Sequence, residues 1–411
     1  MKILAISAFY PPDHSGGYGL RLEEIFDGLS HRGHKVSILT NRANEKPENE
    51  SDDKTNIFRS LHLKNATVNV FRQIYSDCKD LFFLNRILKQ IQPDIIYLGH
   101  IQNLSNTILP YFSKRNYPLV FDEGGSGIIY LHRMCQRGIY FYKNENDSAL
   151  KKLMKGLVYK FTNVVSLGLI TPKWPWPENM RIFYNSQSGL HNALDQGAPV
   201  EDAEVIYSGL DLVKFPYQER QKIEAPVKIL MPTRIKEPKG CLDGVKLIRE
   251  LKKRNISAEL QIIGEVQSEA YYSLMMDTIQ ELGLADFVKI DGMISQSELS
   301  QRYHNSDITF FPSYFKTGFS RVPLEAMASG CLVITYGNEG TKEVVQNSKN
   351  GIIAEEGDII GLADSIQALI VDPDGYKKIV QAARKEVESR FSLENYLDHI
   401  ESLLYEDFRE S

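Results

Sequence analysis

The chain has 411 residues, of which 42% are hydrophobic and 25% charged, so it is long enough for two or three globular domains with substantial cores. Its formal net charge of −5 argues against a general nucleic-acid-binding protein, because no excess of basic residues exists to neutralise phosphates. The four cysteines are scattered, no signal peptide is visible and no apolar run reaches membrane-spanning length, so we expect a cytoplasmic protein with reduced cysteines.

The first half of the chain alternates short apolar runs with amphipathic stretches, which predicts a parallel, doubly wound sheet. The glycine pair Gly16 and Gly17 at the entrance to the first helix either lets a phosphate or sugar approach the backbone or serves only as a tight turn. Ligands bind such sheets at the carboxyl ends of strands, where we find His100, Asp122, Glu123, Gly124 and Gly125. The predicted strands are Lys2–Phe9, Val36–Thr40, Val68–Phe71, Pro93–Leu98, Leu119–Asp122, Asn163–Ile170, Arg181–Tyr184 and Glu204–Tyr207.

Residues 130–161 are rich in tyrosine and lysine. Within them, a stretch around Leu150–Lys160 interleaves lysines with leucine, methionine and valine, which predicts a basic amphipathic helix. Such a helix can lie on an anionic membrane. The commoner interpretation, which we favour from the sequence, is a domain helix with a solvated lysine face.

The second half of the chain, after an irregular linker at 212–226, is a second series of alternating strands and helices. Its predicted strands are Val227–Met231, Ala258–Ile263, Val288–Asp291, Ile308–Phe311, Val333–Tyr336 and Gly351–Ile353. Its predicted helices are Leu242–Lys253, Ala270–Leu282, Ser297–Asn305, Val322–Ser329, Ile360–Ile370 and Tyr376–Arg390, with a last helix at Leu393–Tyr405. Two doubly wound domains in tandem follow from this pattern.

Residues 305–336 combine a buried strand, a loop with Gly318 and a short helix that ends at Gly330. A strand, a flexible loop and a helix N-terminus form an anion site, because unpaired N–H groups and the positive end of the helix dipole face the loop. Arg234 and Lys239 follow the first strand of the same domain and are able to neutralise a pyrophosphate, although a solvated loop explains two cations equally well.

Several common motifs are missing. The chain has no Gly-x-Gly-x-x-Gly after a strand and no Gly-x-x-x-x-Gly-Lys-Ser/Thr, which disfavours dinucleotide-dependent oxidoreductases and P-loop nucleotidases. The histidines are dispersed without metal-ligand spacing, and no Gly-x-Ser-x-Gly nucleophile motif occurs.

The arrangement resembles the retaining glycosyltransferases of family 4, which have the GT-B fold. The segment FFPSYFKTGFSRVPLEAMASGCLVITYGNEGTKEVV is similar to the donor-site segment of that family, and Arg234 with Lys239-Gly240 is similar to its diphosphate-binding pair. VIYSGLDLVKF resembles the turn at the domain junction, and Gly16-Gly17 with RGHKVSILT resembles the N-terminal glycine loop and second strand.

The resemblance implies a role for each matching residue. Arg234 and Lys239 would hold the phosphates of the donor, and Glu325 would accept a hydrogen bond from the nucleotide ribose. Backbone N–H groups around Phe319, Ser320 and Arg321 would contact phosphate and sugar. The remaining donor contacts implied by the family are Gly16, Gly17, Met293, Ile294, Thr317 and Gly318. Members of the family usually need no metal, because fixed cations and a helix dipole replace it.

Two positions depart from the family pattern. A second glutamate typically stands eight positions before Glu325, where this chain has Thr317, a neutral hydroxyl in place of a carboxylate that contacts the donor sugar. The histidine that the family often has in its first domain is absent from LVFDEGGSG, so Asp122, Glu123 and His100 are the candidates for contacting sugar or acceptor.

We therefore predict a GT-B protein with two doubly wound Rossmann-like domains and an interdomain cleft. The first domain would comprise residues 1–207 and the second residues 208–391, and the C-terminal helix 392–411 would pack back on the first domain. It would be a metal-independent retaining transferase that moves a hexose, by family frequency glucose from UDP-glucose, to an acceptor hydroxyl in polysaccharide or glycolipid synthesis. No cofactor is expected, and Arg234, Lys239, Asp122 and Glu123 are the predicted catalytic residues. The partners expected are a UDP-sugar donor, a saccharide or lipid-linked acceptor and peripheral contact with the inner membrane face, but no nucleic acid. The alternatives are a non-catalytic nucleotide-sugar-binding partner subunit and another GT-B enzyme, such as a nucleotide-sugar epimerase.

Overall fold

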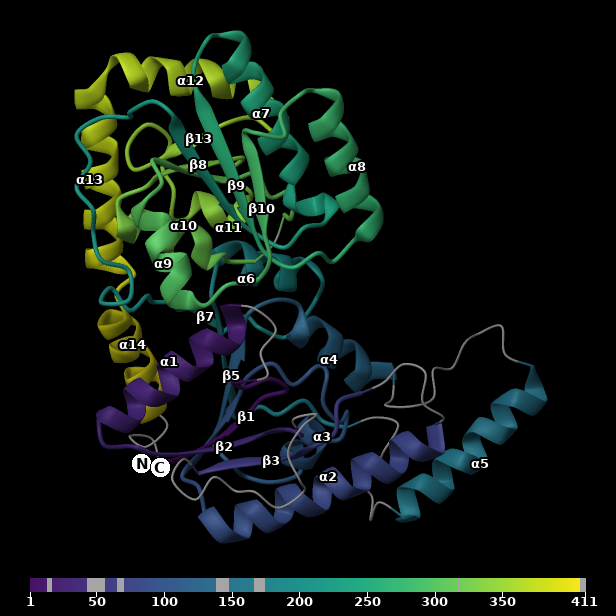
Figure 1. Ribbon diagram of the computed structural model, residues 1–411. Coiled ribbons are helices and arrows are strands. Elements are labelled where there is room, and N and C mark those ends of the chain that lie inside the picture. Colours follow the sequence, from purple (N-terminus) through teal and green to yellow (C-terminus); the bar gives the residue numbers. More distant parts are fainter. Residues whose placement is uncertain are drawn as a thin grey trace. The chain divides into compact units, whose positions relative to one another are not determined.

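A computed structural model of the protein describes residues 1–12, 17–42, 56–64, 70–137, 148–165, 174–316 and 318–406 (Figure 1). The chain divides into two compact units. Unit 1 comprises Met1–Ile206 and Leu397–Ser411, and unit 2 comprises Tyr207–Tyr396. Among the described residues, no helix combines the length and the apolar character needed to cross a bilayer.

Unit 1 is built around a seven-stranded sheet with the order β3-β2-β1-β4-β5-β6-β7, and every adjacent pair of strands is parallel. Parallel strands need crossover connections, and helices supply most of them. The strands are β1 (Lys2–Ile6), β2 (Lys35–Asn41), β3 (Ile57–Leu61), β4 (Ile95–Leu98), β5 (Leu119–Glu123), β6 (Met180–Tyr184) and β7 (Glu204–Val205). The helices are α1 (Gly17–His31), α2 (Val70–Ile91), α3 (Ile108–Ser113), α4 (Gly127–Arg137), α5 (Ala149–Val165) and α6 (Gln187–Asp195).

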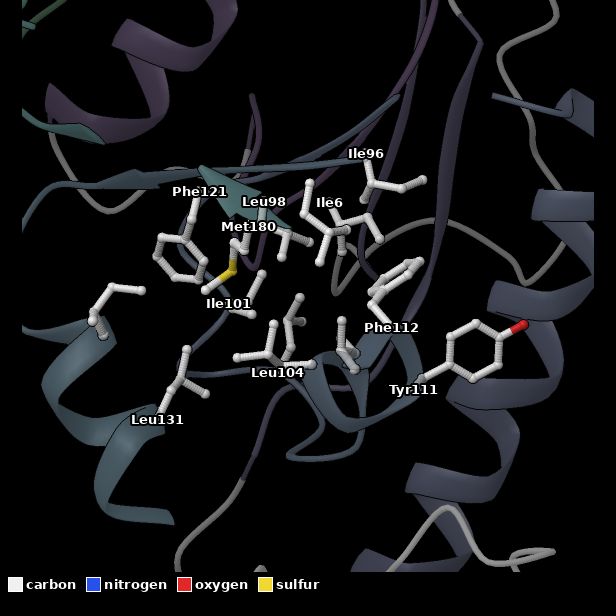
Figure 2. Close-up of a cluster of buried hydrophobic side chains, with 14 of the residues drawn as sticks. Ile6, Ile96, Leu98, Ile101, Leu104, Tyr111, Phe112, Phe121, Leu131 and Met180 are labelled. Atoms are coloured by element: carbon white, nitrogen blue, oxygen red, sulfur yellow. The ribbon is translucent and has the colours of Figure 1, made fainter. Parts of the chain in front are cut away.

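The core of unit 1 lies between this sheet and the segments that cover it. Figure 2 shows strand residues such as Ile6, Leu98 and Phe121 facing Leu104 and Phe112 from the segments between β4 and β5. All five side chains are at most 2% exposed. Because β1 and β4 are covered on both faces, their near-continuous apolar sequences were readable as buried strands.

Unit 2 is built around a six-stranded parallel sheet with the order β10-β9-β8-β11-β12-β13. The strands are β8 (Val227–Pro232), β9 (Ala258–Ile263), β10 (Val288–Asp291), β11 (Ile308–Phe311), β12 (Leu332–Thr335) and β13 (Ile352–Ile353). The helical segments are η1 (Glu237–Lys239), α7 (Cys241–Lys253), α8 (Glu269–Glu281), α9 (Gln296–His304), α10 (Arg321–Ser329), α11 (Glu339–Lys342), α12 (Ile359–Val371) and α13 (Pro373–Arg390). In each sheet the strand order reverses beside the first strand, which makes both units doubly wound.

The last helix, α14 (Leu393–Glu406), has residues in both units, because the division falls between Tyr396 and Leu397. Its unit 1 part is fixed to α1 and the turn after it. The Nη1 atom of Arg32 lies 2.7 Å from Asp398 Oδ1, and His34 Nε2 lies 2.7 Å from Glu401 Oε1. Hydrogen bonds to Glu401 are the largest of the effects that lower the pKa of its carboxyl group.

Two of the predicted strands of unit 1 are wrong where the structure describes them. Val70 and Phe71, predicted to end a strand, begin α2, and residues 68–69 lie outside the described part. Asn163–Val165 form the last turn of α5, not the start of a strand, and residues 166–170 are again not described. In both places a short β-branched or aromatic run was mistaken for a strand, although it continues an amphipathic helix. The strand β3 was not predicted.

Candidate functional site

Three cations stand together after the first strand of unit 2. Arg234 lies two residues beyond β8 and is exposed, Lys236 precedes η1, and Lys239 ends it. The Nζ atom of Lys239 lies 5.4 Å from the centre of the Phe311 ring and 5.0 Å from that of Phe315. The Nζ atom of Lys236 lies 5.4 Å from the Phe315 ring. Among the described residues, none of the three forms an ion pair with a carboxylate.

The electrostatics of this cation cluster favour binding of an anion. Burial, and after it the positive charges of Arg234 and Lys236, lower the pKa of Lys239 to about 8. Burial and Arg234 also lower the pKa of Lys236. Like charges that depress one another's pKa are relieved when an anion binds among them, because the anion stabilises the charged forms. Lys236 was not predicted as a site residue, because nothing in its spacing from Arg234 distinguishes it in the sequence from an ordinary surface lysine.

Close backbone packing positions this cluster. Gly240, between η1 and α7, has φ +69°, a left-handed conformation that side chains disfavour. A Cβ atom on Gly240 would collide with the carbonyl oxygen of Pro312, at the end of β11. The loops after β8 and β11 are therefore in direct contact, which brings Lys239 to the segment that leads into α10.

The helix α10 begins close to this segment, as predicted. Ser320 is its N-cap residue, and the Ser320 hydroxyl accepts a hydrogen bond of 3.4 Å from the backbone N–H of Val322. The carbonyl of Gly318, where φ is +105°, leaves no space for a Cβ atom on Gly340. Phe319 is half-buried and lies 5.9 Å, ring centre to ring centre, from Tyr207. Thr317 lies outside the described residues.

Glu325, on α10, is fixed by the residues around it. It is 7% exposed, and its Oε2 atom accepts a hydrogen bond of 2.9 Å from the Tyr303 hydroxyl. The Nε atom of Arg321 lies 3.5 Å from Glu325 Oε1. Burial and the neighbouring Glu325 raise the pKa of Tyr303 well above its ordinary value, so Tyr303 stays a hydrogen-bond donor. The orientation of the Glu325 carboxylate is therefore set from inside the unit.

The remaining predicted residue pair of unit 2 follows β10. Met293 is 71% exposed, whereas Ile294 is half-buried against the cluster that contains Phe319 and Leu324. A pocket of ≈ 570 Å³ lies at the ends of β12 and β13, lined by Lys316, Tyr336, Asn338, Lys342 and Glu356 among others. None of the predicted donor residues that the structure describes lines this pocket.

In unit 1, the two carboxylates predicted to be catalytic are buried. Asp122 is 1% exposed; its Oδ1 atom lies 2.6 Å from Arg21 Nη2, and its Oδ2 atom accepts a hydrogen bond of 2.8 Å from the Tyr97 hydroxyl. Glu123 is 2% exposed and accepts hydrogen bonds from the backbone N–H groups of Gly125 and Ile128, at 2.6 and 2.5 Å. Burial raises the pKa of both carboxyl groups, and these partners oppose the increase. The contacts give Asp122 a role in the core and Glu123 a role at the start of α4.

The other unit 1 residues are placed as follows. Gly17 is exposed and is the first residue of α1, and Gly16 lies outside the described part of the chain. His100 follows β4 and packs on the rings of Phe9 and Tyr18, with ring centres 5.7 and 5.5 Å away. Burial lowers the pKa of His100, which favours the neutral imidazole.

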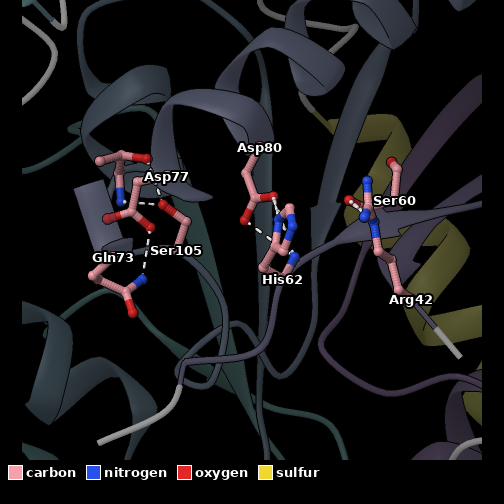
Figure 3. Close-up of polar contacts among 8 residues, drawn as sticks. Arg42, Ser60, His62, Gln73, Asp77, Asp80 and Ser105 are labelled. Atoms are coloured by element: carbon pink, nitrogen blue, oxygen red, sulfur yellow. Dashed lines mark hydrogen bonds and ion pairs between the residues drawn. The ribbon is translucent and has the colours of Figure 1, made fainter. Parts of the chain in front are cut away.

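Unit 1 also contains a buried polar cluster that was not predicted (Figure 3). His62, directly after β3, places its Nδ1 atom 2.6 Å from Asp80 Oδ1. Asp77, one turn away on α2, is fully buried, and its Oδ1 atom accepts a hydrogen bond of 3.0 Å from the Gln73 side chain. Burial raises the pKa of Asp77 to about 7, although hydrogen bonds from Ser105 and Gln73 oppose the increase. The polar members come from segments far apart in the sequence, which explains why sequence patterns missed them.

We expect the stability of unit 1 to fall as pH rises from about 4 to about 7. In the folded state Asp77 keeps a proton that the unfolded chain releases. Its contribution to the stability of unit 1 is therefore fully present below the unfolded pKa and is lost as pH rises through the folded pKa. Asp77→Asn should reduce this dependence, of which the other buried carboxyl groups of unit 1 retain a part, and should stabilise unit 1 at pH 8 by about 1–3 kcal/mol. The chain has two tryptophans, Trp174 and Trp176, and both lie in unit 1. The urea midpoint followed by tryptophan fluorescence therefore measures the stability of unit 1.

The matched control for this experiment is Asp195→Asn, on the exposed face of α6 in the same unit. It should keep the wild-type pH dependence. An Asp77→Asn variant whose midpoint still falls between pH 5 and pH 8 as in the wild type would contradict the assignment to Asp77.

Comparisons with known proteins agree with this architecture. Residues 215–386 match the family model described as "Glycosyl transferases group 1", and residues 15–168 match the one described as "Glycosyltransferase Family 4". HepE of Anabaena, solved in complex with UDP-glucose, superimposes with a TM-score of 0.69 at 18% identity and covers 99% of this chain and 100% of HepE. The two parallel α/β units form a GT-B fold.

Two curated relatives are similar over part of the chain. The amylovoran biosynthesis glycosyltransferase AmsK of Erwinia amylovora is 30% identical over 207 residues, which is 49% of this chain and 50% of AmsK. A glycogen synthase of Mycobacterium tuberculosis is 26% identical over 195 residues, 47% of this chain and 46% of the synthase. The chain thus spans about half the length of these curated relatives.

Proposed function

We propose that the protein is a glycosyltransferase that moves a hexose from a nucleotide diphosphate sugar to an acceptor hydroxyl, in the synthesis of a polysaccharide or glycolipid. The observation that carries this proposal is the cation cluster of Arg234, Lys236 and Lys239 beside the loop that leads into α10. Three mutually repelling cations and a helix N-terminus provide positive charge where a diphosphate leaving group develops negative charge.

The proposed roles of the donor-site residues follow from their placement. Arg234 offers a planar fork of donors to phosphate oxygens, and Lys239 a compact charge whose position is set by the Phe311 and Phe315 rings. Glu325, held by Tyr303, accepts a hydrogen bond from the ribose. In this proposal the departing diphosphate takes the proton of the acceptor, so no further carboxylate base is required, and the sugar is transferred with retention and without a metal ion.

UDP is our proposed nucleotide and glucose our proposed sugar. HepE, which has the same fold, has been solved with UDP-glucose, and the related AmsK and glycogen synthase carry names from polysaccharide synthesis. The donor-site residues do not distinguish a saccharide acceptor from a peptide or protein acceptor. The proposed acceptor class therefore rests on these relatives.

We expect UDP and UDP-glucose to raise the melting temperature of the purified protein, with smaller shifts for GDP and ADP. Glu325→Gln should reduce the UDP shift strongly, because its amide keeps the size of the side chain but loses the ionised acceptor. Glu250→Gln on α7, where the carboxylate pairs with Lys253, is the matched control and should shift as the wild type does. The absence of any shift with UDP, GDP and ADP sugars would refute a donor site.

Release of free UDP in the presence of a saccharide acceptor distinguishes an enzyme from a nucleotide-sugar-binding partner subunit. Thr317 bears on this second candidate, since the family typically has a glutamate at that position. The binding subunit would be favoured if the protein binds UDP-glucose but releases no UDP with every saccharide and lipid-linked acceptor of a panel. Conversion of UDP-glucose to another UDP-sugar would favour an epimerase.

A further inference from the structure

The helix α5 exposes one continuous apolar face. Six large apolar side chains of α5 are exposed by between 54% and 74%. At 3.6 residues per turn, their positions fall within about 100° of the helix circumference. They are Leu150, Leu153, Met154, Leu157, Phe161 and Val164. Among the α5 side chains that the structure describes, none belongs to the main buried cluster of unit 1. In a water-soluble helix such a face normally packs on a core, so this one needs another apolar environment.

The charge of α5 indicates what that environment is. The sequence of the helix, Ala149–Val165, has four lysines and no aspartate or glutamate, whereas the whole chain has a net charge of −5. Lys160 is exposed beside Phe161. A helix with a strong apolar face, lysines and no acidic residues suits the surface of an anionic bilayer, where the apolar face enters the headgroup boundary.

The helix α2 has the same character on its exposed side. Tyr75 and Phe82 are 62% and 67% exposed, and Arg72, Arg86 and Lys89 are exposed within the same arc of about 100°. The two acidic residues of α2, which belong to the polar cluster of Figure 3, are at most 1% exposed. The outward side of α2 therefore combines aromatic rings with basic residues and presents no carboxylate.

We propose that unit 1 docks on anionic phospholipid bilayers through the exposed faces of α5 and α2 (Figure 1). Contact with a second copy of the chain is disfavoured, because a two-fold contact would bring the same basic surfaces together. The bilayer supplies both missing partners, acyl chains for the apolar residues and anionic headgroups for the basic ones. The inference is independent of the nucleotide-sugar proposal, since unit 1 carries both helices and unit 2 the cation cluster.

Co-sedimentation of the full chain with vesicles tests the docking. The protein should bind vesicles that contain phosphatidylglycerol and bind pure phosphatidylcholine vesicles at least about tenfold less, and added salt should weaken the first interaction. Leu153→Asp combined with Phe161→Asp should reduce binding to phosphatidylglycerol vesicles by at least about tenfold, because both substitutions place charge in the apolar face. The tryptophan-fluorescence urea midpoint should stay that of the wild type.

The matched control substitutes exposed apolar residues of unit 2, Leu274→Asp with Val371→Asp, which are 54% and 79% exposed in the wild type. It should bind vesicles as the wild type does. Three results would overturn the proposal. The first is equal binding to both vesicle types, and the second is an equal loss of binding in the α5 double variant and the unit 2 control. The third is self-association without lipid that the α5 double variant abolishes. A complementary variant, Arg86→Glu with Lys160→Glu, should lose the preference for phosphatidylglycerol.

Discussion

Lys239→Ala is expected to weaken UDP binding by about 30- to 100-fold, which corresponds to about 2–3 kcal/mol for a charge-assisted contact to phosphate. Lys239 is the most buried cation of its cluster, and its Nζ atom lies 5.4 and 5.0 Å from the centres of the Phe311 and Phe315 rings. Isothermal titration calorimetry measures the change. Lys253→Ala, at the exposed end of α7, is the matched control and should bind UDP as the wild type does.

The same titration tests the electrostatic argument through its pH dependence. Because the pKa of Lys239 is about 8 without ligand and a bound diphosphate raises it, binding at pH 8 should take up protons. UDP affinity of the wild type should therefore fall as pH rises through about 8. Lys239→Arg should bind UDP without that fall, since arginine stays charged. Proton uptake that is unchanged in Lys239→Ala would place the titrating group elsewhere.

Arg21→Ala should destabilise unit 1 by about 3–5 kcal/mol, the usual cost of leaving one member of a buried ion pair without its partner. Arg21 and Asp122 are 2% and 1% exposed, so the substitution leaves a buried carboxyl group without its cationic partner. Urea unfolding followed by tryptophan fluorescence measures the loss in unit 1 alone. Lys35→Ala, at the exposed start of β2, should change the midpoint little.

Asp122→Asn separates a core role from the predicted catalytic one. If Asp122 acts through the core, the variant should lose stability, and the activity per folded molecule should change little. A fully stable Asp122→Asn variant that releases no UDP would instead support direct participation in the reaction. Glu123 accepts two backbone hydrogen bonds at the start of α4. For its amide variant, Glu123→Gln, we likewise expect a loss of stability and little change in the activity per folded molecule.

The fold of unit 2 was largely predictable because its strands are short apolar runs bounded by glycines and polar turns. The predicted Ala258–Ile263, Val288–Asp291 and Ile308–Phe311 coincide with β9, β10 and β11. Unit 1 was harder, since α2 and α5 begin or end in β-branched and aromatic residues that also suit strands. Local pattern alone cannot separate these cases; the helical periodicity over the following turns decides them.

The positions of the proposed donor-site residues were predictable only where a residue lies next to a strand end or helix start. Arg234, Lys239 and Ser320 have that position, and the sequence places them correctly beside these elements. Tyr303, which orients Glu325, is 22 residues away in sequence, and Arg21 is 101 residues from Asp122. Such pairings depend on the packing of whole elements, which no spacing in the sequence encodes.

The division of α14 between the units has a consequence for the order in which the protein becomes complete. Residues 207–396 are contiguous, so unit 2 has its whole chain available before the unit 1 part of the last helix has been synthesised. Unit 1 starts first but finishes last, because Leu397 packs at Gly28 and Glu401 binds His34 across more than 360 residues. During synthesis, which joins about 5–20 residues per second, residues 1–206 of unit 1 wait for residues 397–406. Its α1 surface stays uncovered throughout that interval.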